Sequence, residues 1–285
     1  MSTWVKGSTL TSPDGSVAVT PRQGGGYALS TLGPGITSST LQPIWWLKGD
    51  YGLTAGSTWL NAGTAGGSAT CPATSTAATV NGLPALGLAT NATTVTLPNV
   101  AFVNAPRAIF AVIKLTQALA TNNTAVFVGP ATTTPSISFC SGLTIIPSTS
   151  YNSIYPYMAR YGAVSGTVGV LTNNLVTGVQ CAYPYANFMN NTSTPNLVGC
   201  VYTAAASSGL AYINGVQIPC TSTVYDTPPS YLTAPIPYAF PSPTTFTTIA
   251  TSMNLCELQM YDGLMSQSQA ASIVAGLVAK WGVVA

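Results

Sequence analysis

Acidic side chains are the groups in this sequence that could perform acid–base chemistry. The sequence contains no histidine, which removes Ser-His-Asp and Cys-His arrangements and the commonest general base near neutral pH. Glycoside hydrolysis in its usual form needs two carboxylates that flank the scissile bond at a set separation. Glu257 and Asp262 are near neighbours, but their odd offset places them on opposite faces of a strand unless a turn at Asp262-Gly263 redirects the second. We therefore predict that the chain is not an enzyme, and that both acids make hydrogen bonds or cap turns. The five acids are Asp14, Asp50, Asp226, Glu257 and Asp262.

Cysteine is the other residue type that could bind a metal. The six cysteines lie far apart, with no C-x-x-C pair and no histidine to complete a zinc site. The run of glycines at positions 24–26 lacks the lysine of a phosphate-binding loop. We predict no metal and no cofactor. The thiols are expected to be mostly buried and free, and the alternative is one or two disulfides formed after release from the cell. The cysteines are Cys71, Cys140, Cys181, Cys200, Cys220 and Cys256.

Charge is scarce along the whole sequence. Charged residues make up 4% of the chain, with a net charge of +2, against roughly 25% charged residues in a typical soluble protein. Hydroxyls, amides and backbone must therefore cover the surface, and little charge repulsion keeps copies apart. This composition favours an assembly, with a hydroxyl-rich secreted monomer as the alternative. The scattered basic residues argue against nucleic-acid binding, and we expect neither a membrane span nor a signal peptide.

A tyrosine-rich stretch between residues 151 and 188 holds the candidate binding residues. Tyrosine offers a flat apolar face and a hydroxyl, which suit a protein interface or the stacking of a sugar. The alternative is that these rings cover the edge of the core or pack loops together. The candidates are Tyr151, Tyr155, Tyr157, Arg160, Tyr161, Tyr183, Tyr185 and Phe188. Four asparagines begin N-x-[ST] glycosylation sequons, namely Asn91, Asn122, Asn190 and Asn191.

The elements that must position these residues are mostly short strands. Residues 1–42 are rich in Ser, Thr, Gly and Pro without a sustained period, which predicts an extended N-terminal arm. From residue 43 to 285, short apolar runs rich in β-branched and aromatic residues alternate with turn residues, which is typical of an all-β antiparallel sandwich or jelly roll. Asn214-Gly215 predicts a two-residue hairpin turn. The runs lie at 44–47, 94–97, 108–114, 125–128, 136–139, 196–202, 210–215 and 255–261.

A single helix is predicted over residues 266–281, after the last strand. Ser266 and Gln269 form an S-x-x-Q capping box. Lys280 lies in the final turn, where a cation faces the negative helix end, and Gly282 can adopt the left-handed cap. The apolar face at 3.6-residue spacing consists of Ala270, Ile273, Val274, Leu277, Val278 and Trp281.

The order of these motifs resembles the concanavalin A-like, laminin-G-like jelly-roll domains of viral, phage and bacterial surface proteins. Trp46, Asp50, Trp59, Asn61 and Gly63 match an opening W-x-x-x-D strand and the turn that follows it. The segment 81–84 matches N-G-x-P, and the closing strand and helix are matched by Glu257, Tyr261, Asp262, Leu264 and 280–282. The resemblance covers residues 43–283 and implies a two-sheet sandwich that binds glycans or proteins. The paired acids of the hydrolases and the Asp/Asn/His cluster of the calcium-dependent lectins are absent from the sequence.

Together these observations predict a non-enzymatic structural protein of a virion or similar surface assembly. Its partners would be copies of itself or other structural proteins, held together by the arm. The alternative is a carbohydrate-binding attachment module that uses the tyrosine-rich stretch.

Overall fold

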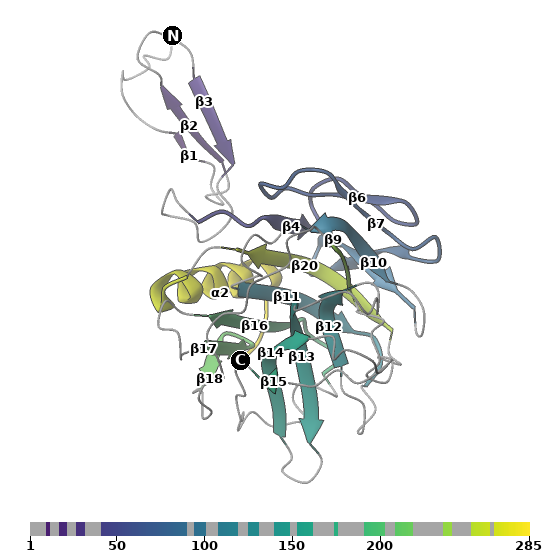
Figure 1. Ribbon diagram of the computed structural model, residues 1–285. Helices are drawn as coiled ribbons and strands as arrows, with labels where there is room; N and C mark the ends of the chain where they lie inside the picture. The colour runs from purple at the N-terminus through teal and green to yellow at the C-terminus, as the bar shows by residue number, and fades with distance from the viewer. Residues whose placement is uncertain are drawn as a thin grey trace.

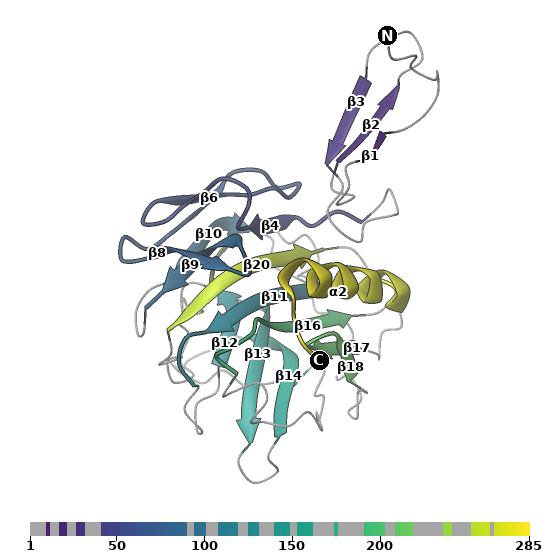
Figure 2. The same ribbon diagram turned by 180° about the vertical axis from the view of Figure 1, so that it is seen from behind.

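The computed structural model describes the backbone of residues 10–11, 17–21, 27–31, 41–89, 94–100, 108–118, 125–130, 140–148, 153–161, 174–175, 191–202, 209–218, 236–240, 252–262 and 265–285. These residues form an antiparallel β-sandwich followed by a C-terminal helix, as Figures 1 and 2 show from opposite sides. The predicted all-β sandwich with a closing helix is therefore confirmed.

One sheet of the sandwich has eight strands and carries the helix. Its order is β18 (Val216–Ile218), β17 (Gly209–Ile213), β16 (Asn196–Tyr202), β11 (Ala108–Leu115), β20 (Met253–Tyr261), β9 (Leu83–Leu88) and β8 (Thr76–Val80). The eighth strand, β4 (Trp45–Lys48), pairs with the second half of β20, while β9 pairs with the first half. The opening and closing segments of the sandwich therefore lie side by side in this sheet.

The other sheet has nine strands. Its order is β15 (Asn174–Leu175), β14 (Ser153–Tyr161), β13 (Cys140–Ser148), β12 (Ala125–Pro130), β19 (Ile236–Phe240), β10 (Val95–Val100), β7 (Ser68–Thr70), β6 (Thr58–Leu60) and β5 (Leu53–Thr54). The tyrosine-rich stretch thus contributes β14, a strand that its Pro-containing composition did not predict. The predicted strand at 136–139 lies outside the described residues.

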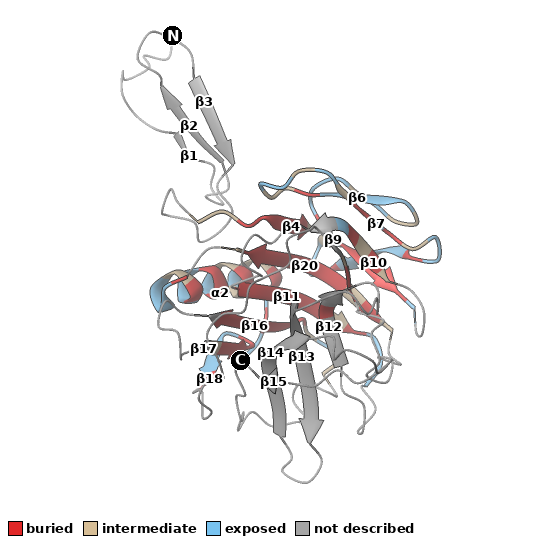
Figure 3. Ribbon diagram, in the orientation of Figure 1, coloured by how far each residue is buried: buried red, intermediate tan, exposed pale blue. Residues whose placement is uncertain are grey.

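The core explains why the central strands are almost continuously apolar. Strand β11 is buried along nearly its whole length because alternate side chains face opposite layers. Phe110 and Val112 pack in the cluster beneath the helix, together with Tyr212 and Tyr261. The ring of Phe110 meets that of Tyr261 edge to face, at 6.2 Å between centroids. Figure 3 shows the buried central strands between the exposed outer turns.

The helix α2 (Gln267–Trp281) forms where the sequence predicted it. The Ser266 hydroxyl accepts a hydrogen bond from the Gln269 backbone N–H, and the Gln269 side chain accepts one from the Ser266 N–H. Gly282 ends the helix in the left-handed conformation, with φ 62°. The predicted apolar face packs on the eight-stranded sheet, although Val278 is only partly buried.

Two hairpins of this sheet turn through Asn-Gly. The predicted turn between β17 and β18 has φ 48° at Asn214 and 86° at Gly215. A second turn, between β8 and β9, has φ 51° at Asn81 and 80° at Gly82. Positive φ at both central residues is the type I′ geometry, which matches the twist of the flanking strands.

The N-terminal residues contain strands that their composition did not predict. Strands β1 (Leu10–Thr11), β2 (Val17–Pro21) and β3 (Tyr27–Thr31) form an antiparallel sheet of their own. Within the described part of the chain, no helix has the length and apolar character needed to cross a membrane.

Candidate functional site

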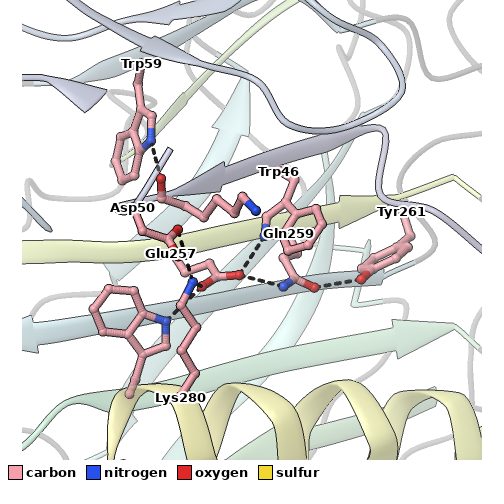
Figure 4. A network of polar contacts seen from close by, with 9 residues as sticks. Trp46, Asp50, Trp59, Glu257, Gln259, Tyr261 and Lys280 are labelled. Carbon is pink, nitrogen blue, oxygen red and sulfur yellow. Dashed lines mark hydrogen bonds and ion pairs between the residues drawn. The ribbon is translucent and has the colours of Figure 1, made fainter. Parts of the chain in front are cut away.

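Glu257 is the acid that the sequence singled out, and it lies in the middle of β20 on the face covered by α2. Four donors surround its carboxylate (Figure 4). Oε1 accepts hydrogen bonds from Trp46 Nε1 at 2.6 Å and from Gln259 Nε2 at 2.8 Å. Oε2 accepts from Lys280 Nζ at 2.9 Å and from Trp281 Nε1 at 2.8 Å. The carboxylate therefore links β4, β20 and the end of α2 through hydrogen bonds.

The burial of this carboxylate decides what it can do. The Glu257 side chain has no solvent-exposed area, while that of Lys280 is 14% exposed. A buried charge is tolerated only when it is paired and its lone pairs are used, and here two donors reach each oxygen. The residue therefore makes hydrogen bonds, as predicted, and no oxygen of its carboxylate faces solvent.

The acid that the tertiary structure brings towards Glu257 is Asp50, not Asp262. Asp50 Oδ1 lies 3.4 Å from Lys280 Nζ, so one ammonium group contacts both carboxylates. Asp50 is on the surface, with 44% of its side chain exposed. Asp262 follows the end of β20 and is half-buried. The sequence could not reveal that Asp50 and Glu257 share Lys280, because Asp50 and Lys280 are far apart along the chain.

The polar network continues away from Glu257 along β20. Tyr261 OH donates to Gln259 Oε1 at 2.6 Å, and these residues alternate on the strand with apolar core residues. Burial raises the pKa of the Tyr261 hydroxyl, and the nearby Glu257 carboxylate raises it further. The hydroxyl therefore keeps its proton and acts as a donor. Hydrogen bonds link Tyr261, Gln259 and Glu257 along this face of β20.

Asn61 performs a comparable role beside β4. Its Oδ1 accepts hydrogen bonds from the backbone N–H groups of Trp46, at 2.7 Å, and Gly63, at 2.8 Å. Its Nδ2 donates to the carbonyl oxygens of Ile44 and Gly66, both at 3.0 Å. All four hydrogen-bonding positions of this amide are used. The residues that matched the opening motif therefore hold β4 and the following turns in place.

A group of three exposed side chains and one half-buried lysine lies at the surface next to this network. We call Lys48, Asp50, Tyr51 and Leu60 the Tyr51 corner. The ammonium of Lys48 lies 4.6 Å from the ring centroid of buried Trp46 and 5.5 Å from that of Tyr51. Tyr51 is 44% exposed and Leu60 43% exposed, and they are two of the four large hydrophobic residues exposed in the described part of the chain.

The local backbone explains why these side chains gather. Leu60 N–H donates to the Gly52 carbonyl at 3.0 Å, and a Cβ at Gly52 would lie 2.5 Å from Leu60 side-chain atoms. Gly52, with φ 60°, thus lets the turn after Tyr51 fold onto Leu60. The indole N–H of Trp59 donates to the Lys48 carbonyl at 2.9 Å. Among the described residues, no carboxylate lies within ion-pair distance of Lys48, and its ammonium contacts the Trp46 and Tyr51 rings instead.

The sequence did not single out the Tyr51 corner as a site. Of the six charged side chains that the structure describes, four lie in the corner or in the network beneath it: Lys48, Asp50, Glu257 and Lys280. The other two are Lys114 and Asp262. In a chain that is 4% charged, such clustering marks a position that requires charge. Along the sequence the same residues lie in two distant segments, Lys48 and Asp50 in one and Glu257 and Lys280 in the other.

The tyrosine-rich candidates lie mainly outside what the structure describes. Tyr155, Tyr157 and Tyr161 occupy alternate positions of β14, with Arg160 between the last two, and their side chains are not described. Tyr151, Tyr183, Tyr185, Phe188 and the sequon residues Asn91, Asn122 and Asn190 fall outside the described residues. They therefore stay predictions.

Asn191 is the sequon residue that the structure describes, and it is half-buried. Its Nδ2, the atom that would carry a glycan, donates to Thr194 Oγ1 at 2.7 Å and to Asn196 Oδ1 at 3.2 Å. Its Oδ1 accepts from the backbone N–H groups of Ser193 and Thr194. The side chain thus stabilises the turn before β16, and glycosylation would have to break these bonds.

The three cysteines with described side chains are buried and form no disulfide. Burial raises the pKa of the Cys71 thiol to about 11. Burial, followed by the charge of Glu257, raises that of Cys256 to about 12. Cys200 is also buried and forms no disulfide, whereas Cys140, Cys181 and Cys220 lack described side chains. No group of three potential metal ligands occurs within the residues described.

This architecture defines a class: a two-sheet antiparallel β-sandwich with one C-terminal helix. Solved structures of binding domains share it. The binding domain of botulinum neurotoxin serotype D aligns with a TM-score of 0.56 and 10% identity, over 85% of this chain and 55% of that one. The binding domain of botulinum neurotoxin DC in complex with SialylT aligns at 0.55 and 9%, over 82% and 51%. This chain thus spans about half the length of those domains.

A smaller solved domain matches over its whole length. Domain 4 of the extracellular GH43 arabinanase AbnA from Geobacillus stearothermophilus, solved in complex with arabinotriose, aligns at a TM-score of 0.51 and 14% identity. The alignment covers 83% of this chain and 100% of that domain. At such identities the likeness establishes the fold. No protein-family model matches the sequence, and no curated protein matches it significantly.

Proposed function

We propose that this chain is a non-catalytic carbohydrate-binding module that binds glycans through the Tyr51 corner. The observation that carries the proposal is the corner itself: the exposed Tyr51 ring lies near the Lys48 ammonium, which has no acidic partner among the described residues. Asp50 beside them in sequence is exposed, and exposed Leu60 lies against the turn at Gly52. Domains of similar fold include one solved with arabinotriose and one with SialylT. The proposed family is the concanavalin A-like, laminin-G-like one that the motifs of the sequence resemble.

The chemistry of the corner suits a saccharide. A sugar ring has an apolar C–H face that packs on an aromatic ring such as Tyr51, and hydroxyls at its edge that both donate and accept hydrogen bonds. The Lys48 ammonium supplies donors, and the Asp50 carboxylate supplies acceptors. The two charges cancel, so the corner favours an uncharged saccharide. The Glu257 network fixes Trp46, which contacts Lys48, and Lys280, which contacts Asp50. Because these supporting residues are already ordered, the entropic cost of ordering the site on binding is lower.

The state of Glu257 supports a binding role rather than hydrolysis. A glycosidase of the usual kind needs one carboxylic acid and one carboxylate that both reach the substrate. Glu257 is the only glutamate in the sequence, and its two oxygens are buried and bonded to four donors. Asp50 is exposed, but a single accessible acid in this cluster does not supply the pair.

A glycan array with the full chain tests the proposal. Binding of at least one neutral oligosaccharide is expected, and it should be lost in Tyr51→Ala. Val216→Ala is the matched control, because Val216 is equally exposed, at 44%, but lies on β18, the edge strand of the eight-stranded sheet, several strands away from β4. Tyr155→Ala separates the corner from the tyrosine-rich strand. Retention of binding in Tyr51→Ala together with its loss in Tyr155→Ala would move the site to β14, and no binding by the wild type would refute the proposal.

A second candidate is a structural subunit of a virion or similar surface assembly, in which the N-terminal residues join neighbouring copies. The observation that favours it is the near absence of charge, which leaves little electrostatic repulsion between copies. Size-exclusion chromatography with light scattering on the full chain and on a variant that lacks residues 1–42 tests it. Oligomers that dissociate on truncation are expected, and a monomer in both cases would refute it.

A further inference from the structure

The two Asn-Gly turns offer an internal comparison, because they share a dipeptide and a backbone conformation. Asn81-Gly82 joins β8 to β9, and Asn214-Gly215 joins β17 to β18. Their φ angles agree within a few degrees. Any difference in the chemistry of the two asparagine side chains must therefore come from their surroundings.

The surroundings of Asn214 hold its amide rigidly. The residue is 1% exposed. Its Oδ1 accepts from Leu197 N–H at 2.8 Å, its Nδ2 donates to Asn196 Oδ1 at 3.0 Å, and its own N–H donates to the Leu197 carbonyl at 2.9 Å. A Cβ at Gly215 would lie 3.1 Å from Val278 Cγ2, so the turn packs against the helix.

The surroundings of Asn81 are open except at the end of the helix, where its amide lies against Trp281 and Gly282. Both residues of the turn are exposed, and no atom lies within 4 Å of the position that a Cβ at Gly82 would take. Within the described part of the chain, the side chain makes one hydrogen bond, from Nδ2 to the carbonyl oxygen of Trp281 at 2.5 Å. Trp281 is the last residue of α2, so this amide caps the helix end from a hairpin 200 residues away in sequence.

We propose that Asn81 is a site of deamidation that releases this cap. The backbone nitrogen of Gly82 loses its proton and attacks the side-chain carbonyl carbon of Asn81. A carbon–nitrogen bond forms, ammonia leaves, and the product is a five-membered succinimide. Water then opens the ring to aspartate or isoaspartate. In total, one amide and one water become one carboxylic acid and one ammonia. A glycine in the second position favours the attack because no side chain blocks it.

The reaction removes the donor that the helix end uses. An ionised carboxylate has only acceptors, and it would face the Trp281 carbonyl at the negative end of the helix macrodipole. The hydrogen bond between residue 81 and the Trp281 carbonyl is thus replaced by repulsion. The indole of the same Trp281 donates to Glu257 at 2.8 Å. Deamidation of Asn81 therefore loosens the last turn of α2 and the polar network beneath the Tyr51 corner. The change is irreversible, so the fraction of loosened molecules increases with age.

Incubation of the full chain at mildly alkaline pH, followed by proteolysis and mass spectrometry, tests the site. Asn81 is expected to deamidate about tenfold faster than Asn214 or more, because opening the Asn214 turn breaks more hydrogen bonds. Equal rates, or faster reaction at Asn214, would overturn the proposal. The measurement does not involve glycan binding, so its failure is distinct from failure of the proposed function.

Two variants test the consequence. Asn81→Asp reproduces the aspartate product, and Asn81→Gly keeps the turn but removes the side chain without adding charge. We expect Asn81→Asp to lower Tm by about 2–4 °C, with faster hydrogen exchange in the last turn of α2, and Asn81→Gly to have a smaller effect. Wild-type protein aged to complete deamidation should match Asn81→Asp or melt lower. An unchanged Tm in both the aged protein and Asn81→Asp would show that the cap has no such role.

Discussion

The substitution Glu257→Gln tests whether the buried carboxylate holds the end of the sandwich. Glutamine has nearly the same shape but replaces one acceptor oxygen with an NH2 group. One of the two donor pairs, either Trp46 with Gln259 or Lys280 with Trp281, would then face donors instead of an acceptor. The other pair would keep its hydrogen bonds to a neutral oxygen.

The size of the effect follows from what is lost. A hydrogen bond to a charged group contributes about 1.5–3 kcal/mol, and a buried donor left without a partner costs a similar amount. Lys280, whose side chain is 14% exposed, would also lose its buried counter-ion. Breaking one partner of a buried pair costs about 3–5 kcal/mol, and we expect a loss of unfolding free energy in that range. In a domain of this size this lowers Tm by roughly 10 °C.

Urea unfolding monitored by circular dichroism and tryptophan fluorescence measures this loss. The matched control is Asp50→Asn, which removes the other acidic partner of Lys280. Because Asp50 is 44% exposed, that change should cost less than about 1 kcal/mol. If Glu257→Gln and Asp50→Asn cost the same small amount, the carboxylate is not the structural centre of this end of the sandwich, and the reasoning fails.

Three further outcomes are expected. Gly49→Ala should destabilise the chain by about 1–3 kcal/mol, because a Cβ there would overlap the carbonyl oxygen of Pro84; an unchanged Tm would contradict this. Ser266→Ala should cost about 1 kcal/mol by removing the helix cap, seen as a lower urea midpoint with an unchanged slope. Cys71 and Cys256, with pKa values raised to about 11 and about 12 from an ordinary 9.0, should resist alkylation in the native protein and react once it is unfolded. Because the folded state holds these thiol protons more tightly, their contribution to stability is full below pH 9.0 and falls as pH rises toward the raised values; equal labelling of native and unfolded protein would refute this.

Local patterns were sufficient to predict the helix and seven of the sandwich strands, whereas others, such as β6, β8, β9, β13 and β19, were not among the predicted runs. The helix has a capping box, an apolar face and a glycine cap that all act within a few residues, so its limits were predicted to within one residue. Strands such as β16 and β20 consist of apolar runs between turn residues, and Asn214-Gly215 has the backbone preference that its hairpin needs. Strand β14 was missed because tyrosine and proline in a polar context resemble a loop. Its pairing with β13 is a non-local property.

For Glu257, the sequence predicted the role of the side chain but not its partners. The lack of histidine and of a second glutamate argued against acid–base chemistry and predicted a hydrogen-bonding role, which the structure shows. The partners themselves could not be predicted, because Trp46 and Glu257 are 211 residues apart. Strand alternation indicated only that Glu257 and Asp262 would lie on opposite faces.

Tertiary structure decided the partners of the Tyr51 corner and the Asn81 cap. Lys48, Asp50 and Tyr51 are close in the sequence, but Lys280, which contacts Asp50, is 230 residues away. Nothing near Asn81 in sequence distinguishes it from Asn214. Helix caps, turns and strand alternation depend on steric and hydrogen-bonding preferences over a few residues, which a sequence displays directly. The burial of a carboxylate and the exposure of an amide depend on which distant segments the sheets bring together, and that is a property of the packed chain.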